Sequence, residues 1–233
     1  MKVALKLALA VGAASGLAGC VEEARIAMPS GLAASSERVE LTGMGGGERG
    51  RFRLGSSEGR FTRSSISASY DGGPVVRNLG GGSFELAGPD VAGVLEGECR
   101  FDEAEIKAGS VSFPAKRFAY RCRFRRDGRP IDAGLILEEV PARPGKLLSG
   151  RTRAGEIHMG GRVAEIRPIH DMAGGRLPTA MPLGYSLELD GRPLGAVDLN
   201  GPDKTIFAPR SGPERELVLA ASLALSVLWD PGE

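Results

Sequence analysis

Near its C-terminus the chain carries a stretch that is apolar on every side of a helix. Between residues 217 and 229 the only polar side chains are Ser222 and Ser226, and Pro213 followed by acidic residues is a typical helix start. A helix over this stretch spans about 20 Å, which is too short for a bilayer core of about 30 Å. A helix that is apolar all round must lie inside protein, so the rest of the chain has to enclose residues 213–229.

Alternation of apolar and charged residues predicts that the enclosing structure is made of strands. The alternation is clearest at 95–101, 118–124 and 131–137. The pairs Asp127-Gly128 and Asp190-Gly191 each lie between alternating runs, which is the strongest local signal of a hairpin. Further candidate strands are 38–42, 51–54, 66–70, 83–86, 107–113, 155–159, 162–167, 184–189, 194–199 and 204–208.

The expected fold is therefore mainly β, with roughly ten to twelve short antiparallel strands forming a barrel or roll around one hydrophobic C-terminal helix. A β-sandwich with an appended helix is the alternative. Glycine supplies 35 of 233 residues, and many of these glycines lie between the alternating runs, as expected where short strands bend tightly. The recurrence of Asp-Gly-Arg-Pro at 127 and 190 is compatible with an internal duplication or with the same turn chemistry used twice.

Residues 184–233 resemble the tubby-like C-terminal fold, which is shared by the LURP-one and scramblase-like groups. The residues that carry the resemblance are the hairpin GYSLELDGRPLGAVDLNG, then KTIFAPR, then ERELVLAASLALSVLW. The resemblance implies about twelve strands around a buried C-terminal helix, and some members bind membrane phospholipids. No headgroup-binding residue of that family can be placed on this sequence.

The N-terminus has the layout of a secretory signal, with Lys2 and Lys6 before an apolar run that continues through small residues. Its end, Leu17-Ala18-Gly19-Cys20, resembles the lipobox of bacterial lipoproteins. The resemblance implies that residues 1–19 are removed and that Cys20 carries acyl chains such as palmitate, which anchor the protein to a membrane. An ordinary signal peptide that ends near a cysteine is the alternative.

The residues after Cys20 lack the aspartate that retains many lipoproteins in the inner membrane, so the resemblance favours the outer membrane, facing the periplasm. Residues 20–36 mix charged, small and proline residues without periodicity, and they are expected to form a flexible tether. Residues 37–233 are expected to form a single β-rich domain with the C-terminal helix at 213–229.

Two further cysteines, Cys99 and Cys122, lie on the apolar phase of two alternating runs. An exported protein meets an oxidising environment, so this pair predicts a buried disulfide; two buried thiols are the alternative.

The charged residues nearly balance, with 30 Lys and Arg against 29 Asp and Glu, which argues against nucleic-acid binding through bulk charge. Arginines nevertheless cluster on one strand, and Arg121, Arg123, Arg125 and Arg126 are candidate contacts for anionic lipid. A solvated strand face balanced by nearby acids is the favoured interpretation of this cluster.

Some motifs match those of enzymes, but none has the neighbouring secondary structure that the corresponding active site requires. The sequence Gly55-Ser56-Ser57-Glu58-Gly59 matches a nucleophile elbow, but no helix follows it, so a hairpin turn is expected. The histidines His158 and His170 do not have the spacing of a metal site, and no cofactor is expected.

The expected function is that of a lipid-anchored binding or structural module at the membrane surface, with an envelope protein or anionic lipid as its partner. A periplasmic hydrolase with a site near His170 and Asp171 is the alternative.

Overall fold

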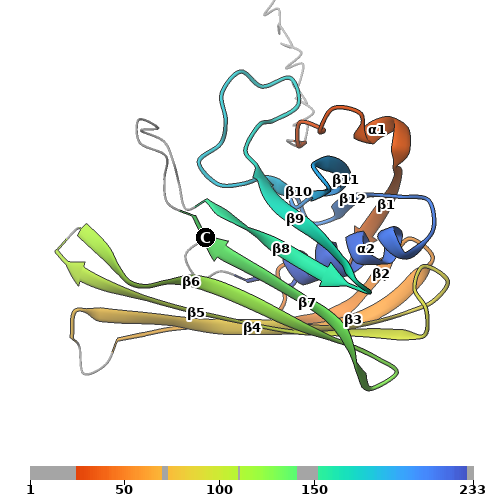
Figure 1. Cartoon of the computed structure of the whole chain (residues 1–233). Helices are drawn as coiled ribbons and strands as arrows, with labels where there is room; N and C mark the ends of the chain where they lie inside the picture. The colour runs from red at the N-terminus through yellow and green to blue at the C-terminus, as the bar shows by residue number, and fades with distance from the viewer. Residues whose placement is uncertain (1–24, 70–72, 110, 141–151, 230–233) are drawn as a thin grey trace, which may run out of the picture.

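The computed structural model describes residues 25–69, 73–109, 111–140 and 152–229, which form a closed antiparallel barrel of twelve strands with a helix inside it (Figure 1). Each strand pairs with its neighbours along the chain, and β1 closes the ring by pairing with β12. The expected barrel is confirmed, and the sandwich alternative is excluded. The strands are β1 Glu37–Thr42, β2 Arg49–Leu54, β3 Ser57–Ser69, β4 Val75–Ala87, β5 Val94–Ala108, β6 Val111–Arg126, β7 Arg129–Glu139, β8 Arg153–Met159, β9 Arg162–Ile169, β10 Gly184–Leu189, β11 Arg192–Asp198 and β12 Lys204–Ala208.

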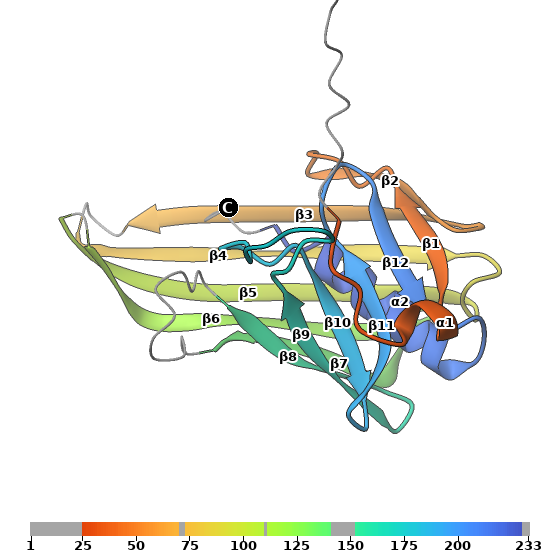
Figure 2. The same cartoon turned by 90° about the horizontal axis from the view of Figure 1, so that it is seen from above.

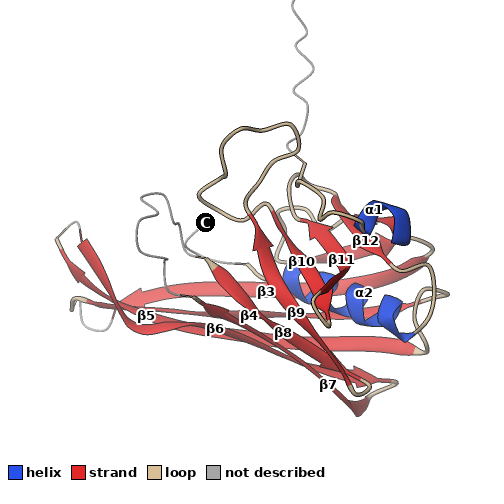
Figure 3. Cartoon of the chain, turned by 45° about the horizontal axis from the view of Figure 1, so that its top comes forward, coloured by secondary structure: helices blue, strands red, loops and turns tan. Residues whose placement is uncertain are grey.

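The C-terminal helix α2, Pro213–Ser226, fills the barrel, as its apolar composition requires (Figure 3). Its residues from Leu217 to Ser226 are all buried. The helix touches β4 and β5 on one side of the ring and β11 and β12 on the other, so it forms the centre of the core. Gly195 on β11 permits a close approach, because a Cβ there would lie 2.6 Å from the Val218 side chain.

Ion pairs hold the first turn of α2 at one end of the barrel. Arg215 is bound to Asp90 at 2.7 Å and also to Glu37, and Arg126 is bound to Glu216. Burial opposes ionisation of Asp90, but hydrogen bonds from Arg215 and Ser57 outweigh it and lower the pKa of this carboxyl. These contacts attach the helix start to β1, to β6 and to the β4–β5 turn.

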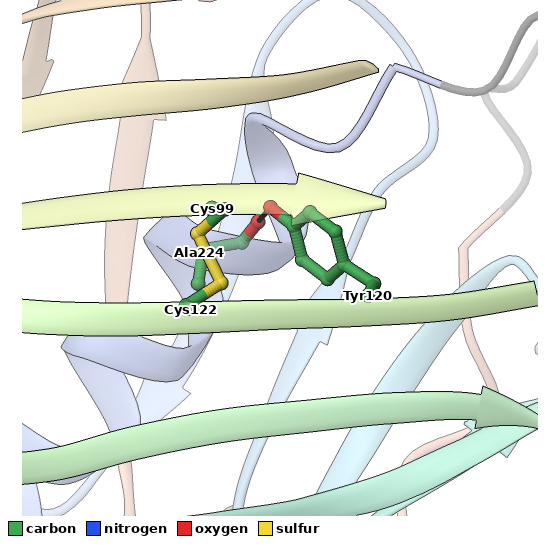
Figure 4. The surroundings of a disulfide bond; sticks show 4 residues. All are labelled: Cys99, Tyr120, Cys122 and Ala224. Atoms are coloured by element: carbon green, nitrogen blue, oxygen red, sulfur yellow. Dashed lines mark hydrogen bonds between the residues drawn. A yellow bond between two sulfur atoms is a disulfide. The ribbon is translucent and has the colours of Figure 1, made fainter. Parts of the chain in front are cut away.

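The last turns of α2 are fixed from the barrel wall by Tyr120, whose hydroxyl donates a 2.6 Å hydrogen bond to the Ala224 carbonyl (Figure 4). Burial raises the pKa of Tyr120. Beside it, Cys99 on β5 and Cys122 on β6 form a buried disulfide, as the sequence predicted.

Both Asp-Gly pairs form tight hairpins with left-handed backbone at each residue. The φ angles are 51° and 77° at Asp127 and Gly128, and 52° and 73° at Asp190 and Gly191. Positive φ at both central positions is the geometry that matches the twist of paired strands, which explains why the same dipeptide occurs twice.

Two expectations about the strands are wrong. The strands are not uniformly short, because β3 to β6 run to between 13 and 16 residues. Residues 107–113 are not one strand either: the chain turns there, and Lys107 at the end of β5 pairs with Ser112 at the start of β6.

Much of the segment expected to be a tether is packed on the outside of the barrel. Residues 25–36, which include the short helix α1 Leu32–Ser35, bury Ile26 and Leu32 against Ala196 of β11. We call residues 25–36 the strap. Four residues, 21–24, separate it from Cys20.

Candidate functional site

The ends of β3 to β6 project beyond the rest of the barrel as a four-stranded sheet (Figure 2). The pairing of β3 with β2 stops at Thr62, and the pairing of β6 with β7 starts only at Ala119. Residues 63–69 of β3 and 111–118 of β6 therefore form the two borders of this projecting sheet, which we call the extension.

Within the barrel wall, these four strands point aromatic rings inward. Phe61, Phe84, Phe101 and Phe118 are each at most 3% exposed, one on each strand. Because alternate residues of a strand face opposite sides, the next apolar residues in the extension face outward. The side chains five positions beyond these rings are Ile66, Leu79, Ile106 and Phe113.

The extension thus exposes its apolar side and turns its polar side inward. The exposed side chains are Ile66, Val75, Leu79, Ile106, Val111 and Phe113, which we call the apolar face. Cross-strand pairing brings them together: Ile66 pairs with Leu79, Val75 with Ile106, and Ile106 with Phe113.

The opposite side of the extension is polar and ordered. Ser67 donates a 2.7 Å hydrogen bond to Asn78, and Glu103, which pairs with Asn78 across β4 and β5, is buried. On all four strands, therefore, the apolar side faces the core within the barrel and faces outward in the extension.

Charged residues lie within and beside the apolar face, because Arg77 stands between Val75 and Leu79 on one side of β4. Asp102 on β5 accepts hydrogen bonds from Arg77 at 2.9 and 3.2 Å and is also bound by Lys116. The hydrogen bond from Arg77, aided by Lys116, lowers the pKa of Asp102 to about 2. A shallow hollow of about 630 Å³ leads from Leu79 over this cluster to Arg121 and Arg123.

The four arginines named from the sequence do not form one group. Arg121 and Arg123 line the outer hollow, and Arg125 continues the row opposite Glu96. Arg126 pairs with buried Leu95 and binds Glu216 in the first turn of α2, so it attaches the helix to the end of the barrel. Arg121 is paired with Glu138 at 2.9 Å, whereas Arg123 and Arg125 show no salt bridge to any residue that the structure describes.

The histidines lie in unrelated places. His170 stands at the neck of the loop between β9 and β10, where its Nδ1 lies 3.0 Å from the Thr179 carbonyl oxygen and its carbonyl accepts bonds from the Thr179 amide and hydroxyl. His158 is half-exposed on β8, with Asp132 3.9 Å away. These contacts give His170 a role in shaping the loop.

The Gly55–Gly59 motif forms the β2–β3 hairpin, in which Leu54 pairs with Ser57. The Ser57 hydroxyl is buried and donates to Asp90 at 2.9 Å. Its geometry is that of a structural turn and not of a nucleophile elbow.

A second hollow, of about 510 Å³, lies where α2 ends. Leu225, Leu228 and Met181 line it with Arg153, whose guanidinium stacks on the Phe118 ring at 3.8 Å. Across the described parts of the chain, no three His, Cys, Asp or Glu side chains are grouped so that they could hold a metal. Over the same residues, no helix has the length and apolarity needed to span a bilayer.

Sequence reasoning missed the apolar face because the strands were expected to be short. The available signal was the repeated spacing of five residues between an inward phenylalanine and an outward apolar residue. Comparison of the chain with family models, with curated proteins and with solved structures finds no match.

Proposed function

We propose that this protein is a lipid-anchored lipoprotein of the cell envelope, held by Cys20 in the outer membrane and facing the periplasm, and that it acts as a binding module. The observation that carries the binding role is the inverted extension. Six apolar side chains, from 36% to 61% exposed, gather on one side of one sheet. These exposed fractions correspond to on the order of 500 Å² of apolar surface, which is the size of the largest apolar patch on a typical monomer, and such patches are often functional.

The partner that fits this surface is a protein with an apolar centre and an acidic margin. The six apolar side chains surround an ion pair, because Arg77 lies between Val75 and Leu79 on one side of β4 and binds Asp102 at 2.9 Å. The charged residues within and beside the apolar face are mainly cationic, with Arg77, Lys116, Arg121 and Arg123 around Asp102 and Glu98. An acidic margin on the partner would complement these cationic residues and speed association.

The position of the anchor argues against the anchoring bilayer as the partner of this face. The strap lies on β10 and β11. In the closed ring β10 is six strands from β4, and β11 is six strands from β5, so the strap and these strands lie on opposite sides of the barrel. If two copies bound each other through their apolar faces, their two anchors would lie on opposite sides of the dimer. Two copies anchored in the same bilayer therefore cannot form this dimer.

The anchor is tested by the mass of the mature N-terminus. We expect a chain that begins at Cys20 and carries acyl groups, and we expect Cys20→Ser to keep its leader and lose the acyl mass. A wild-type chain that retains residues 1–19 unmodified would contradict the anchoring role.

The docking face is tested by a photo-crosslinking residue at Ala108, which lies on the outer side of the extension and pairs with Val111. In intact cells we expect one discrete adduct with another protein, abolished by Phe113→Asp. The matched control is Val163→Asp, because Val163 is similarly exposed but lies on β9.

Three outcomes would contradict the docking proposal. An adduct that survives Phe113→Asp would show that the apolar face is not the contact. An adduct at twice the mass of the chain would indicate self-association, and adducts with lipid alone would indicate a lipid-binding face.

A further inference from the structure

The strap determines where an anchor on Cys20 would meet the barrel. The Ile26 amide donates to the buried carboxylate of Asp198 at 3.0 Å, and Ile26 itself is buried. The Ala27 amide donates to the Asp171 carbonyl, and the Ala173 amide donates to the Arg25 carbonyl, both at 2.8 Å. The chain is therefore fixed from Arg25 onward, and residues 21–24 alone connect it to Cys20.

This connection is too short to reach around the barrel. The step from Arg25 back to Cys20 covers at most about 18 Å in a fully extended chain. A bilayer that holds Cys20 must then lie next to the strap, on the side formed by β9 to β11 and away from the extension.

The loop 170–183 between β9 and β10 rises on this same side (Figures 1 and 3). It pairs with the strap through the bridge between Ile26 and Met172, and the His170–Thr179 bonds close its neck. Its outer part carries Leu177, which at 79% is the most exposed large apolar side chain of the described residues, and Met181, which is also exposed.

The composition of this loop suits an anionic lipid surface. The charged residues of loop 170–183 are Asp171 at its neck and Arg176, which is the single charged residue in the outer stretch MAGGRLPTAMPL, 172–183. Interfacial segments combine apolar side chains that enter the acyl boundary with cations that meet the headgroups. Arg176 and Leu177 are adjacent and exposed, so the two parts are side by side.

We propose that loop 170–183 contacts the bilayer that holds Cys20, with Leu177 and Met181 in the acyl boundary and Arg176 at the lipid phosphates. The inference rests on the proposed anchoring of Cys20. Together the strap and the loop set two contacts on one side of the barrel and orient the apolar face of the extension away from the membrane.

The test uses the full-length acylated protein in vesicles of phosphatidylcholine and phosphatidylglycerol. An environment-sensitive fluorophore is attached to Leu177→Cys, and quencher lipids report its depth. The matched control carries the same fluorophore on Ile66→Cys, which is also strongly exposed but lies in the extension. The native thiols do not interfere, because Cys99 and Cys122 are bonded to each other and Cys20 is acylated.

We expect a blue shift and at least twofold quenching at position 177, and neither at position 66. A further variant, Arg176→Glu, should reduce the quenching at 177 in anionic vesicles while the protein stays vesicle-bound through its acyl chains.

The alternative results separate the two proposals. If the protein binds vesicles but the fluorophore at 177 is not quenched, the proposed membrane contact of the loop is wrong, while the proposed anchoring through Cys20 is unaffected. Quenching at 66 in place of 177 overturns the orientation. Protein that carries no acyl group on Cys20 overturns both the anchor and this inference.

Discussion

Phe101 and Ile106 lie five residues apart on β5 and face opposite sides of the same sheet, with Phe101 3% and Ile106 41% exposed. One strand thus contributes to the core of the barrel with one end and to an outward apolar surface with the other. The same inversion on three neighbouring strands makes the extension the most unusual surface of the molecule.

This relationship predicts effects of very different size for two truncations on one strand. Phe101→Ala removes a ring that stacks on Phe118 in the core and should lower the free energy of unfolding by about 3–5 kcal/mol. Ile106→Ala removes an exposed side chain and should change it by no more than about 0.5 kcal/mol. Urea denaturation of both variants measures the two changes. A comparable loss of stability in Ile106→Ala would show that the Ile106 side chain is packed against other residues.

Tyr120→Phe tests the attachment of the helix to the barrel wall. The variant keeps the ring but leaves the buried Ala224 carbonyl without the hydroxyl that it accepts from, which should cost about 1–3 kcal/mol. The measurement is the unfolding midpoint in urea. An unchanged midpoint would mean that the hydrogen bond contributes nothing to the stability of the barrel.

Gly97→Ala should destabilise the protein because Phe84 lies directly over the backbone of Gly97. A Cβ at this position would come within 2.4 Å of the Phe84 ring, so the ring has to move, at a cost of about 1–3 kcal/mol. Gly46→Ala is the control, because nothing lies within 4 Å of a Cβ at that position. Thermal unfolding of both variants should separate them, and equal midpoints would refute the close-approach argument.

Asp102→Asn should reveal a pH-dependent stabilisation at the base of the extension. The pKa of Asp102 is lowered to about 2 in the folded chain, against about 3.9 when unfolded, so the folded state binds fewer protons over this interval. The stabilisation by its ion pairs is present above about pH 4 and is lost as the pH falls toward 2. The gap in urea midpoint between wild type and variant should therefore shrink below about pH 4; a gap independent of pH would contradict it.

Much of the fold could be predicted from the sequence because its signals are local. The Asp-Gly pairs at 127 and 190 specify hairpins through backbone conformation, and alternation marks which side of each strand enters the core. The all-round apolarity of α2 then requires an enclosure, and a strand wrap is the enclosure that the rest of the chain can build.

The candidate site could not be predicted in this way, because it depends on which strands end together. Ile66 and Phe113 are isolated apolar residues in the sequence, and only the register across β3 to β6 assembles them into one surface. The strap was missed for a related reason: Ile26 and Leu32 lie in a segment without periodicity, and their burial is decided by distant residues of β10 and β11.

The sequence by itself determined the β-rich class, the hairpin turns and the need to bury the C-terminal helix, because each follows from residue chemistry over short distances; it also favoured a disulfide between Cys99 and Cys122. The tertiary structure decided where the apolar face lies, that Arg126 belongs to the helix end, and that the strap and the extension occupy opposite sides of the barrel. These features arise from ring closure and strand register, which set the position of every strand relative to all the others and depend on residues that are far apart in the sequence.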